Sequence, residues 1–120
     1  MIHPYCCQLF HLKNYSAVYR CYVTSPSTLT IGRALMSRPK LLMLDEPSEG
    51  LSPIYTSNVF DTLKILEEQG LTILLVSQEV ERSLELSHRT YVLENGQITV
   101  EGKSSDLLND DKVRESYLGM

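Results

Sequence analysis

The sequence predicts an α/β fold that combines a parallel sheet with a C-terminal β-hairpin. Residues 40–44 (KLLML) and 71–77 (LTILLVS) are apolar runs of strand length, and a segment of helical periodicity separates them. Such runs are typical of strands that are buried on both faces and joined by crossover helices. Residues 90–102 (TYVLENGQITVEG) predict two more strands, joined at the turn dipeptide Asn95-Gly96.

Four helical segments complete this order. The periodicity of residues 29–38 predicts the end of a helix that stops before Pro39. A second helix is expected after Ser52 as N-cap and Pro53 as a first-turn residue, with Gly70 as its C-cap. A short acidic helix over 79–87 and a final helical region over 104–118, broken near 109–111, follow.

Composition and charge limit the possible functions. A chain of 120 residues is long enough for one small domain. It contains no apolar run of 18 residues and no charged start followed by a long apolar region, so we expect a cytoplasmic protein without direct membrane insertion. The net charge of −4 provides no basic patch, which argues against nucleic acid as a partner.

The first 28 residues differ in composition from the remainder. All three cysteines lie within the first 21 residues, and the first 44 residues contain none of the 15 acidic residues. The cysteine spacing fits no common zinc pattern, and an odd count argues against a disulfide framework. We therefore expect residues 1–28 to be an irregular leader with reduced thiols.

Two acidic residues mark the end of the first predicted strand. Asp45 and Glu46 lie where ligands bind in open α/β sheets, beyond the carboxyl ends of the strands. Because neighbouring residues of a strand point in opposite directions, one carboxylate could orient Mg2+ while the other acts on an attacking water. The alternative is that Asp-Glu-Pro begins a solvated loop with both acids facing water.

From Leu29 onward, the residues resemble the ATP-binding-cassette (ABC) transporter ATPases. "LLMLDEPSEGLSP" is similar to the Walker B strand, catalytic glutamate and D-loop of that family. "LTIGRALMSRPK" resembles its post-signature helix, and "TILLVSQEVERSLELSHRTYVLENGQITVEG" resembles its switch strand and closing hairpin. With the ending "LLNDDKVRESYLG", the resemblance is closest to the ATPase subunits of branched-chain amino-acid importers. It covers residues 29–120 and implies the C-terminal half of a P-loop NTPase (RecA-like) core.

The resemblance also implies roles for individual residues. Asp45 would help to hold Mg2+, and Glu46 would polarise the water that attacks the γ-phosphate of ATP. Gln78 occupies the γ-phosphate switch position, where the family usually has histidine; glutamine can donate and accept hydrogen bonds but cannot carry a proton. Its alternative role is to cap a buried strand. The D-loop, which crosses to a partner subunit in this family, would consist of Ser48, Glu49, Gly50 and Leu51.

Two motifs of the family are absent from the sequence. There is no phosphate loop G-x-x-x-x-G-K-[ST], and residues 21–28 (CYVTSPST) do not match the signature motif that should precede Leu29. The nearest match, residues 96–104 (GQITVEGKS), is one residue too long and alternates like a strand, so we expect Gly102-Lys103 to form a turn. Residues 1–28 are therefore expected to be foreign sequence on a truncated ATPase.

Three functional hypotheses follow. The first is an ATPase subunit that powers branched-chain amino-acid import, docked on a membrane permease at the inner face of the cell membrane and paired with a second ATPase subunit. The second is an inactive remnant or weak interaction module without ATP turnover, and the isolated fragment is expected to be poorly active. The third, a metal-dependent phosphohydrolase, would need more ligands, and His88 is expected to lie at the surface. We also expect the two apolar strands to have exposed faces or edges.

Overall fold

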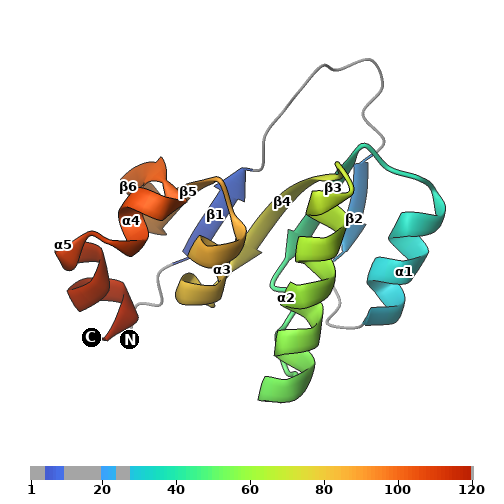
Figure 1. The fold of residues 1–120 in the computed structure, drawn as a ribbon, viewed down its shortest axis with the longest axis horizontal. Coiled ribbons are helices and arrows are strands. Elements are labelled where there is room, and N and C mark those ends of the chain that lie inside the picture. The colour runs from blue at the N-terminus through green and yellow to red at the C-terminus, as the bar shows by residue number, and fades with distance from the viewer. Residues whose placement is uncertain (1–4, 10–19, 24–27, 120) are drawn as a thin grey trace.

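The computed structural model describes residues 5–9, 20–23 and 28–119, which form one twisted sheet with helices packed against it (Figure 1). Its strands lie in the order β2-β3-β4-β1-β5-β6. Their bounds are β1 Tyr5–Leu9, β2 Arg20–Val23, β3 Leu41–Asp45, β4 Thr72–Ser77, β5 Arg89–Glu94 and β6 Gln97–Lys103. Strands β2, β3 and β4 are parallel, whereas β1 pairs antiparallel with both β4 and β5, and β5 with β6. The predicted α/β class with a closing hairpin is confirmed.

The helices follow the predicted order. They are α1 Thr28–Met36, α2 Pro53–Glu68, α3 Val80–Leu86, α4 Ser104–Leu108, α5 Asp111–Val113 and a π-helical turn Arg114–Leu118. Ser52 is the N-cap of α2 and Pro53 its first residue, as predicted, although the Ser52 hydroxyl makes no capping hydrogen bond. The C-cap is Gln69, one residue earlier than expected, and Gly70 follows it at φ 93°. Among the described residues, no helix combines the length and apolar character needed to cross a membrane.

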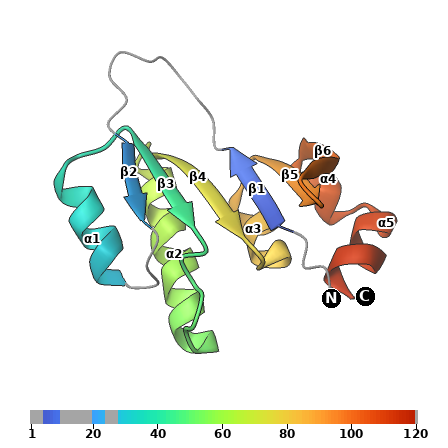
Figure 2. The same cartoon turned by 180° about the vertical axis from the view of Figure 1, so that it is seen from behind.

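The main core lies between α1, α2 and one face of β3 and β4. Alternate strand residues face these helices, so Leu42, Leu44, Ile73 and Leu75 are almost fully buried. The helices contribute Ile31, Ala34, Val59, Phe60 and Leu63. In Figure 1, α2 lies in front of these strands, and Figure 2 shows the sheet in front of the helix. This packing positions the carboxyl ends of β3 and β4 beside the start of α2.

The opposite face of the same strands is less completely covered. Met43, Leu74 and Val76 are only partly buried, and with Leu44 and Asp45 they line a hollow of about 150 Å³. The backbone edges of β3 and β4, in contrast, are not exposed as predicted, because β2 pairs with β3 and β1 pairs with β4. The expected exposure is thus found on one face of the strands, whereas the backbone edges are satisfied.

Two strands lie inside the segment that was expected to be irregular. β1 is inserted between β4 and β5, and β2 extends the parallel part of the sheet beyond β3. The prediction of irregular structure is therefore wrong for residues 5–9 and 20–23. A physical reason is that the backbone edges of β3 and β4 offer unpaired hydrogen-bonding groups, which a neighbouring strand satisfies. Residues 1–4, 10–19 and 24–27 lie outside the described residues, and the domain division at residue 28 stays a prediction.

The C-terminal part follows the predicted hairpin. Asn95 and Gly96 have φ values of 51° and 76°, the two positive values of a type I′ turn. The hydroxyls of Ser87, Thr90 and Ser104 meet in a buried triangle with O···O distances of 2.6–2.9 Å. This triangle connects the end of α3, β5 and the start of α4. The break before α5 occurs at Asn109 and Asp110, within the predicted interval.

Candidate functional site at the carboxyl ends of β3 and β4

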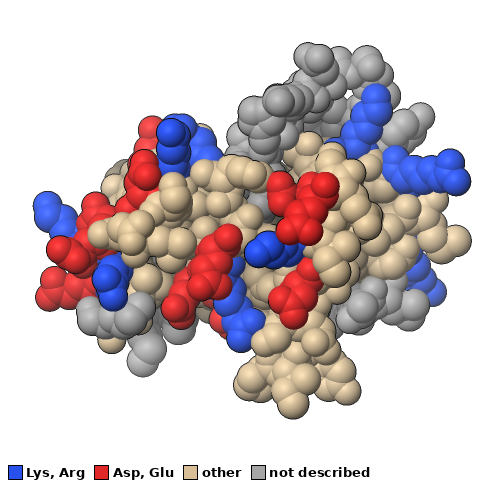
Figure 3. Space-filling model, viewed as in Figure 1, with Lys and Arg blue, Asp and Glu red and all other residues tan. Residues whose placement is uncertain are grey.

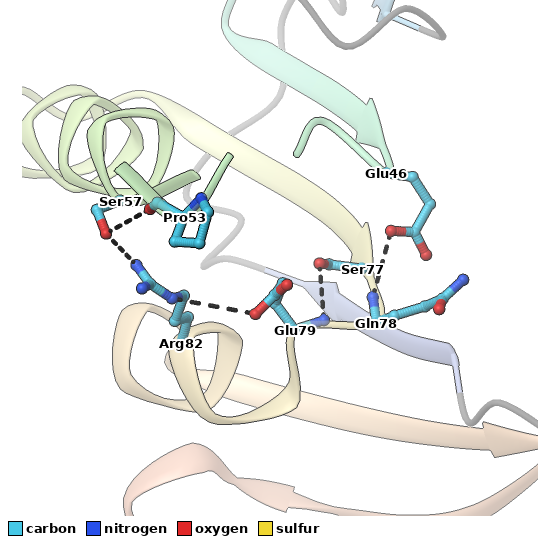
Figure 4. Close-up of polar contacts among 7 residues, drawn as sticks. All are labelled: Glu46, Pro53, Ser57, Ser77, Gln78, Glu79 and Arg82. Atoms are coloured by element: carbon cyan, nitrogen blue, oxygen red, sulfur yellow. Dashed lines mark hydrogen bonds and ion pairs between the residues drawn. The ribbon is translucent and has the colours of Figure 1, made fainter. Parts of the chain in front are cut away.

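The structure brings three of the predicted site residues together at one edge of the sheet. Asp45 is the last residue of β3 and pairs with Val76 of β4, so Glu46 and Gln78 leave the sheet side by side. The Glu46 N–H donates to the Val76 carbonyl at 2.8 Å. The Gln78 N–H donates to Glu46 Oε2 at 3.3 Å, as the dashed line in Figure 4 shows. The parallel pairing therefore places Asp45, Glu46 and Gln78 at the same edge of the sheet.

Glu46 is held in an unusual conformation. Its φ of 47° lies in the left-handed region, which is uncommon for residues other than glycine. Oε1 is buried and has no hydrogen-bond partner among the described residues. Burial raises the pKa of the Glu46 carboxyl, the nearby charges of Asp45 and Glu49 raise it further, and the hydrogen bonds from Gln78 oppose this increase. A carboxyl group with these properties is suited to accept a proton from water.

Asp45 is exposed at the rim of the hollow described above. The described residues contain no group of three His, Cys, Asp or Glu side chains that could hold a metal. Mg2+ nevertheless fits this donor set when substrate phosphates contribute, because it commonly uses one or two carboxylates, several waters and phosphate oxygens.

The predicted D-loop residues form two successive turns between β3 and α2. Glu49 N–H donates to the Glu46 carbonyl at 3.1 Å, and Leu51 N–H donates to the Ser48 carbonyl at 3.1 Å. Ser48 is buried and Leu51 packs against the main core, whereas Glu49 and Gly50 are exposed. The exposed residues lie beside Glu46, but the structure does not bring them to Gln78.

The segment that nearly matches a phosphate loop is a strand. Gln97–Lys103 is β6, with Gly102 paired to Thr90 and Lys103 paired to Arg89. The expectation of a turn at Gly102-Lys103 is wrong, because these residues end the strand and α4 begins directly at Ser104. His88 lies at the surface, as expected, with Nε2 3.4 Å from Glu67 Oε1.

Four residues near the site were not identified from the sequence. The Ser77 Oγ accepts a hydrogen bond from the Glu79 N–H, and Arg82 connects Glu79 with Ser57 of α2 (Figure 4). The three-residue spacing of Glu79 and Arg82 in a predicted helix could have indicated their ion pair. The contact to Ser57 is tertiary and has no local signal in the sequence.

Comparison with known proteins agrees with this geometry. BraG, a high-affinity branched-chain amino acid transport ATP-binding protein of Pseudomonas aeruginosa, is 50% identical over 91 residues, which are 76% of this chain and 39% of that protein. LivF of Archaeoglobus fulgidus, a probable branched-chain amino acid transport ATP-binding protein, is 39% identical over 77% of this chain and 39% of its own. The homologues of this chain are ABC ATP-binding proteins. The lipopolysaccharide export ATP-binding protein LptB of Haemophilus influenzae is also related, with 35% identity over 74% of this chain and 37% of LptB.

Solved structures give the same family. The ADP conformation of an ATP-binding cassette of an ABC transporter matches with a TM-score of 0.61 and 35% identity, over 77% of this chain and 38% of the cassette. A nucleotide-free cassette matches with a TM-score of 0.60 and 34% identity, over 77% of this chain and 38% of the cassette. No protein-family model matches the sequence. The chain thus spans about two fifths of the length of the curated relatives that it matches.

Proposed function

We propose that this chain supplies the magnesium and water-activating part of an ATP-binding, ATP-hydrolysing subunit of a branched-chain amino-acid importer. The main observation in support of this proposal is that Asp45, Glu46 and Gln78 lie together at the carboxyl ends of two parallel strands. The relatives named for branched-chain amino-acid transport support this substrate class, since they reach 50% identity against 33–35% for LptB. The subunit would dock on a membrane permease at the inner face of the cell membrane and pair with a second ATPase subunit.

Each residue of the site would have one task. Asp45, exposed at the end of β3, would hold Mg2+ through a water of its shell, and the ion would neutralise charge on the phosphates. Glu46 would accept a proton from the attacking water, a role that the raised pKa of its carboxyl supports. Gln78 would orient Glu46 through its backbone N–H and contact the γ-phosphate with its side-chain amide.

The four residues 48–51 would contact the partner subunit. The exposure of Glu49 and Gly50, next to Glu46 in the chain, supports this proposal. A phosphate loop from another segment would be required to hold the nucleotide, because the sequence contains no G-x-x-x-x-G-K-[ST] motif. We therefore propose that residues 29–120 correspond to the C-terminal half of such a subunit.

A second candidate is a non-catalytic remnant or interaction module. It is favoured by the chemistry of the hollow beside Asp45, whose other lining residues are Met43, Leu44, Leu74 and Val76 and offer no side-chain donors for phosphate. In that case the chain would have no ATP turnover of its own.

Nucleotide binding by the purified chain separates the two candidates. Micromolar MgATP affinity in isothermal calorimetry, abolished by Asp45→Ala, would contradict the remnant candidate. Asp61→Ala, which removes an exposed carboxylate from α2, is the matched control and should leave affinity unchanged. Equal binding by the Asp45→Ala variant would contradict the proposed function.

A further inference from the structure

A line of polar contacts joins α2 to α3 beside the candidate site (Figure 4). Arg82 of α3 donates from Nη1 to Ser57 Oγ at 2.9 Å. Its Nε lies 4.0 Å from Glu79 Oε2. The Ser57 hydroxyl donates in turn to the Pro53 carbonyl at 3.0 Å. Arg82 therefore contacts α2 and the N-cap residue of its own helix with different nitrogens of one rigid guanidinium group.

Both ends of this line reach segments of the candidate site. Pro53 is the first residue of α2 and follows directly on residues 48–52. At the other end, the Glu79 N–H donates to Ser77 Oγ at 3.1 Å, which fixes the turn that carries Gln78. Gln78 in that turn donates its N–H to Glu46. The contacts thus run from the start of α2 to the residue that holds the Glu46 carboxylate.

The surroundings of Arg82 determine which variants can test its role. Figure 3 shows acidic and basic side chains close together over this helical face. Asp61, Lys64 and Glu85 line the same cleft of about 140 Å³ between α2 and α3. Removing the positive charge of Arg82 would therefore change the net charge of this whole cleft. A variant that removes only the acceptor, Ser57, leaves every charge in place.

We propose that Arg82 is a positioning residue that ties the turn carrying Gln78 to the start of α2. Through Ser57 and Glu79, it couples the motion of the predicted switch residue Gln78 to that of the predicted D-loop, residues 48–51. The meaning of those two segments rests on the proposed function, whereas the coupling between them can be measured without nucleotide. Arg82 itself touches no reacting atom and acts through Glu79 and Ser57.

The test uses amide NMR and hydrogen exchange on the full chain without nucleotide. Ser57→Ala and Arg82→Ala should accelerate exchange of the Glu79 amide roughly two- to fivefold, the ratio that partly exposed contacts of this kind support. Both variants should also shift the amide resonances of Gln78 and of residues 49–51. Arg82→Lys should give intermediate values, because a single ammonium group can engage Ser57 or Glu79 but does not reproduce the fork.

Thr62→Ala is the matched control. Its hydroxyl donates to the Asn58 carbonyl at 2.7 Å, four residues back in the same helix, as Ser57 does to Pro53. It should therefore reproduce the general effect of losing a helix hydroxyl without changing Gln78, Glu79 or residues 49–51. Ser57→Ala shifts that equal those of Thr62→Ala would overturn the proposal, as would changes that stop at Glu79 and never reach residues 49–51.

The result is independent of the nucleotide-binding experiment. A chain that shows the coupled shifts but binds MgATP equally well after Asp45→Ala supports the positioning role and contradicts the proposed function. A chain that binds MgATP without coupled shifts supports the function and overturns the positioning role. If Arg82→Ala unfolds, Ser57→Ala keeps all charges and decides the question.

Discussion

Replacing Glu46 by glutamine should stabilise the fold at neutral pH. In the native structure Oε1 of Glu46 is buried without a hydrogen-bond partner among the described residues, and Oε2 receives one long bond from Gln78 at 3.3 Å. On folding, the ionised carboxylate therefore loses hydrogen bonds to water and gains few from the protein in return. Glutamine keeps the shape and an acceptor for the Gln78 N–H but removes the buried charge and its repulsion with Asp45 and Glu49.

The size of the effect follows from the cost of burying an incompletely bonded group. An unsatisfied neutral group costs about 1–3 kcal/mol and a charged one costs more, so the exchange should raise the free energy of unfolding on the order of 1 kcal/mol. For a domain of this size, that corresponds to roughly 4 °C in melting temperature.

The gain must also depend on pH. Burial raises the pKa of Glu46 above its value in the unfolded chain, so the native protein loses stability as the pH rises from the unfolded pKa through the folded pKa. Below this pH window Glu46 is protonated in both the folded and the unfolded state, and the neutral carboxylic acid resembles the amide of glutamine. The advantage of Glu46→Gln should accordingly be absent near pH 3 and complete near pH 8.

Urea unfolding followed by circular dichroism across this pH range would measure the difference. Glu68→Gln, which neutralises an exposed acid at the end of α2, is the control and should change stability by less than about 0.5 kcal/mol at either pH. A stabilisation by Glu46→Gln of equal size at pH 3 and pH 8 would refute the reasoning, and so would a destabilisation at pH 8.

Four further substitutions test the packing, the backbone conformation at two glycines and the hydroxyl triangle. Leu63→Ala removes a fully buried side chain of α2 from the main core and should lower the free energy of unfolding by about 2–5 kcal/mol in urea; a loss below 1 kcal/mol would contradict this packing. Gly96→Ala should lower the free energy of unfolding by about 1–2 kcal/mol, because φ is 76° at this position. Gly32 lies in α1 with open space around it, so Gly32→Ala should raise the free energy of unfolding by about 0.5–1 kcal/mol. Thermal melts that shift in the same direction for both variants would be inconsistent with these backbone conformations. Ser104→Ala should cost about 1 kcal/mol in urea because it breaks the buried hydroxyl triangle, and a neutral result would indicate that the triangle contributes no net stability.

The elements of the fold were predictable wherever a local pattern carried the information. The runs at 40–44 and 71–77 gave β3 and β4 within one residue, and Asn95-Gly96 located the hairpin turn. Strands β1 and β2 were missed because their pairing is determined by the edges they cover, and those edges belong to β3, β4 and β5. No periodicity within residues 1–28 contains that information.

The candidate site divides in the same way. Asp45 and Glu46 were proposed because they lie at the end of an apolar strand, and Gln78 was proposed from the family resemblance. Parallel pairing of β3 and β4 brings these positions together. The positive φ of Glu46 and its orphaned oxygen were not predictable, since they depend on how the chain turns into α2. Arg82 was missed because its partner Ser57 lies 25 residues away in the sequence.

The charges around Glu46 indicate what a nucleotide site built on this edge must obtain from elsewhere. The charged groups that perturb its carboxyl are Asp45 and Glu49, both acidic, so three acids lie close together where ATP phosphates would be placed. Phosphates approaching this edge would be repelled unless Mg2+ and basic or N–H donor groups neutralised them. The hollow beside Asp45 is lined by apolar side chains and supplies none of these donors. Under the proposed function, these residues would act on a nucleotide that another segment or subunit holds.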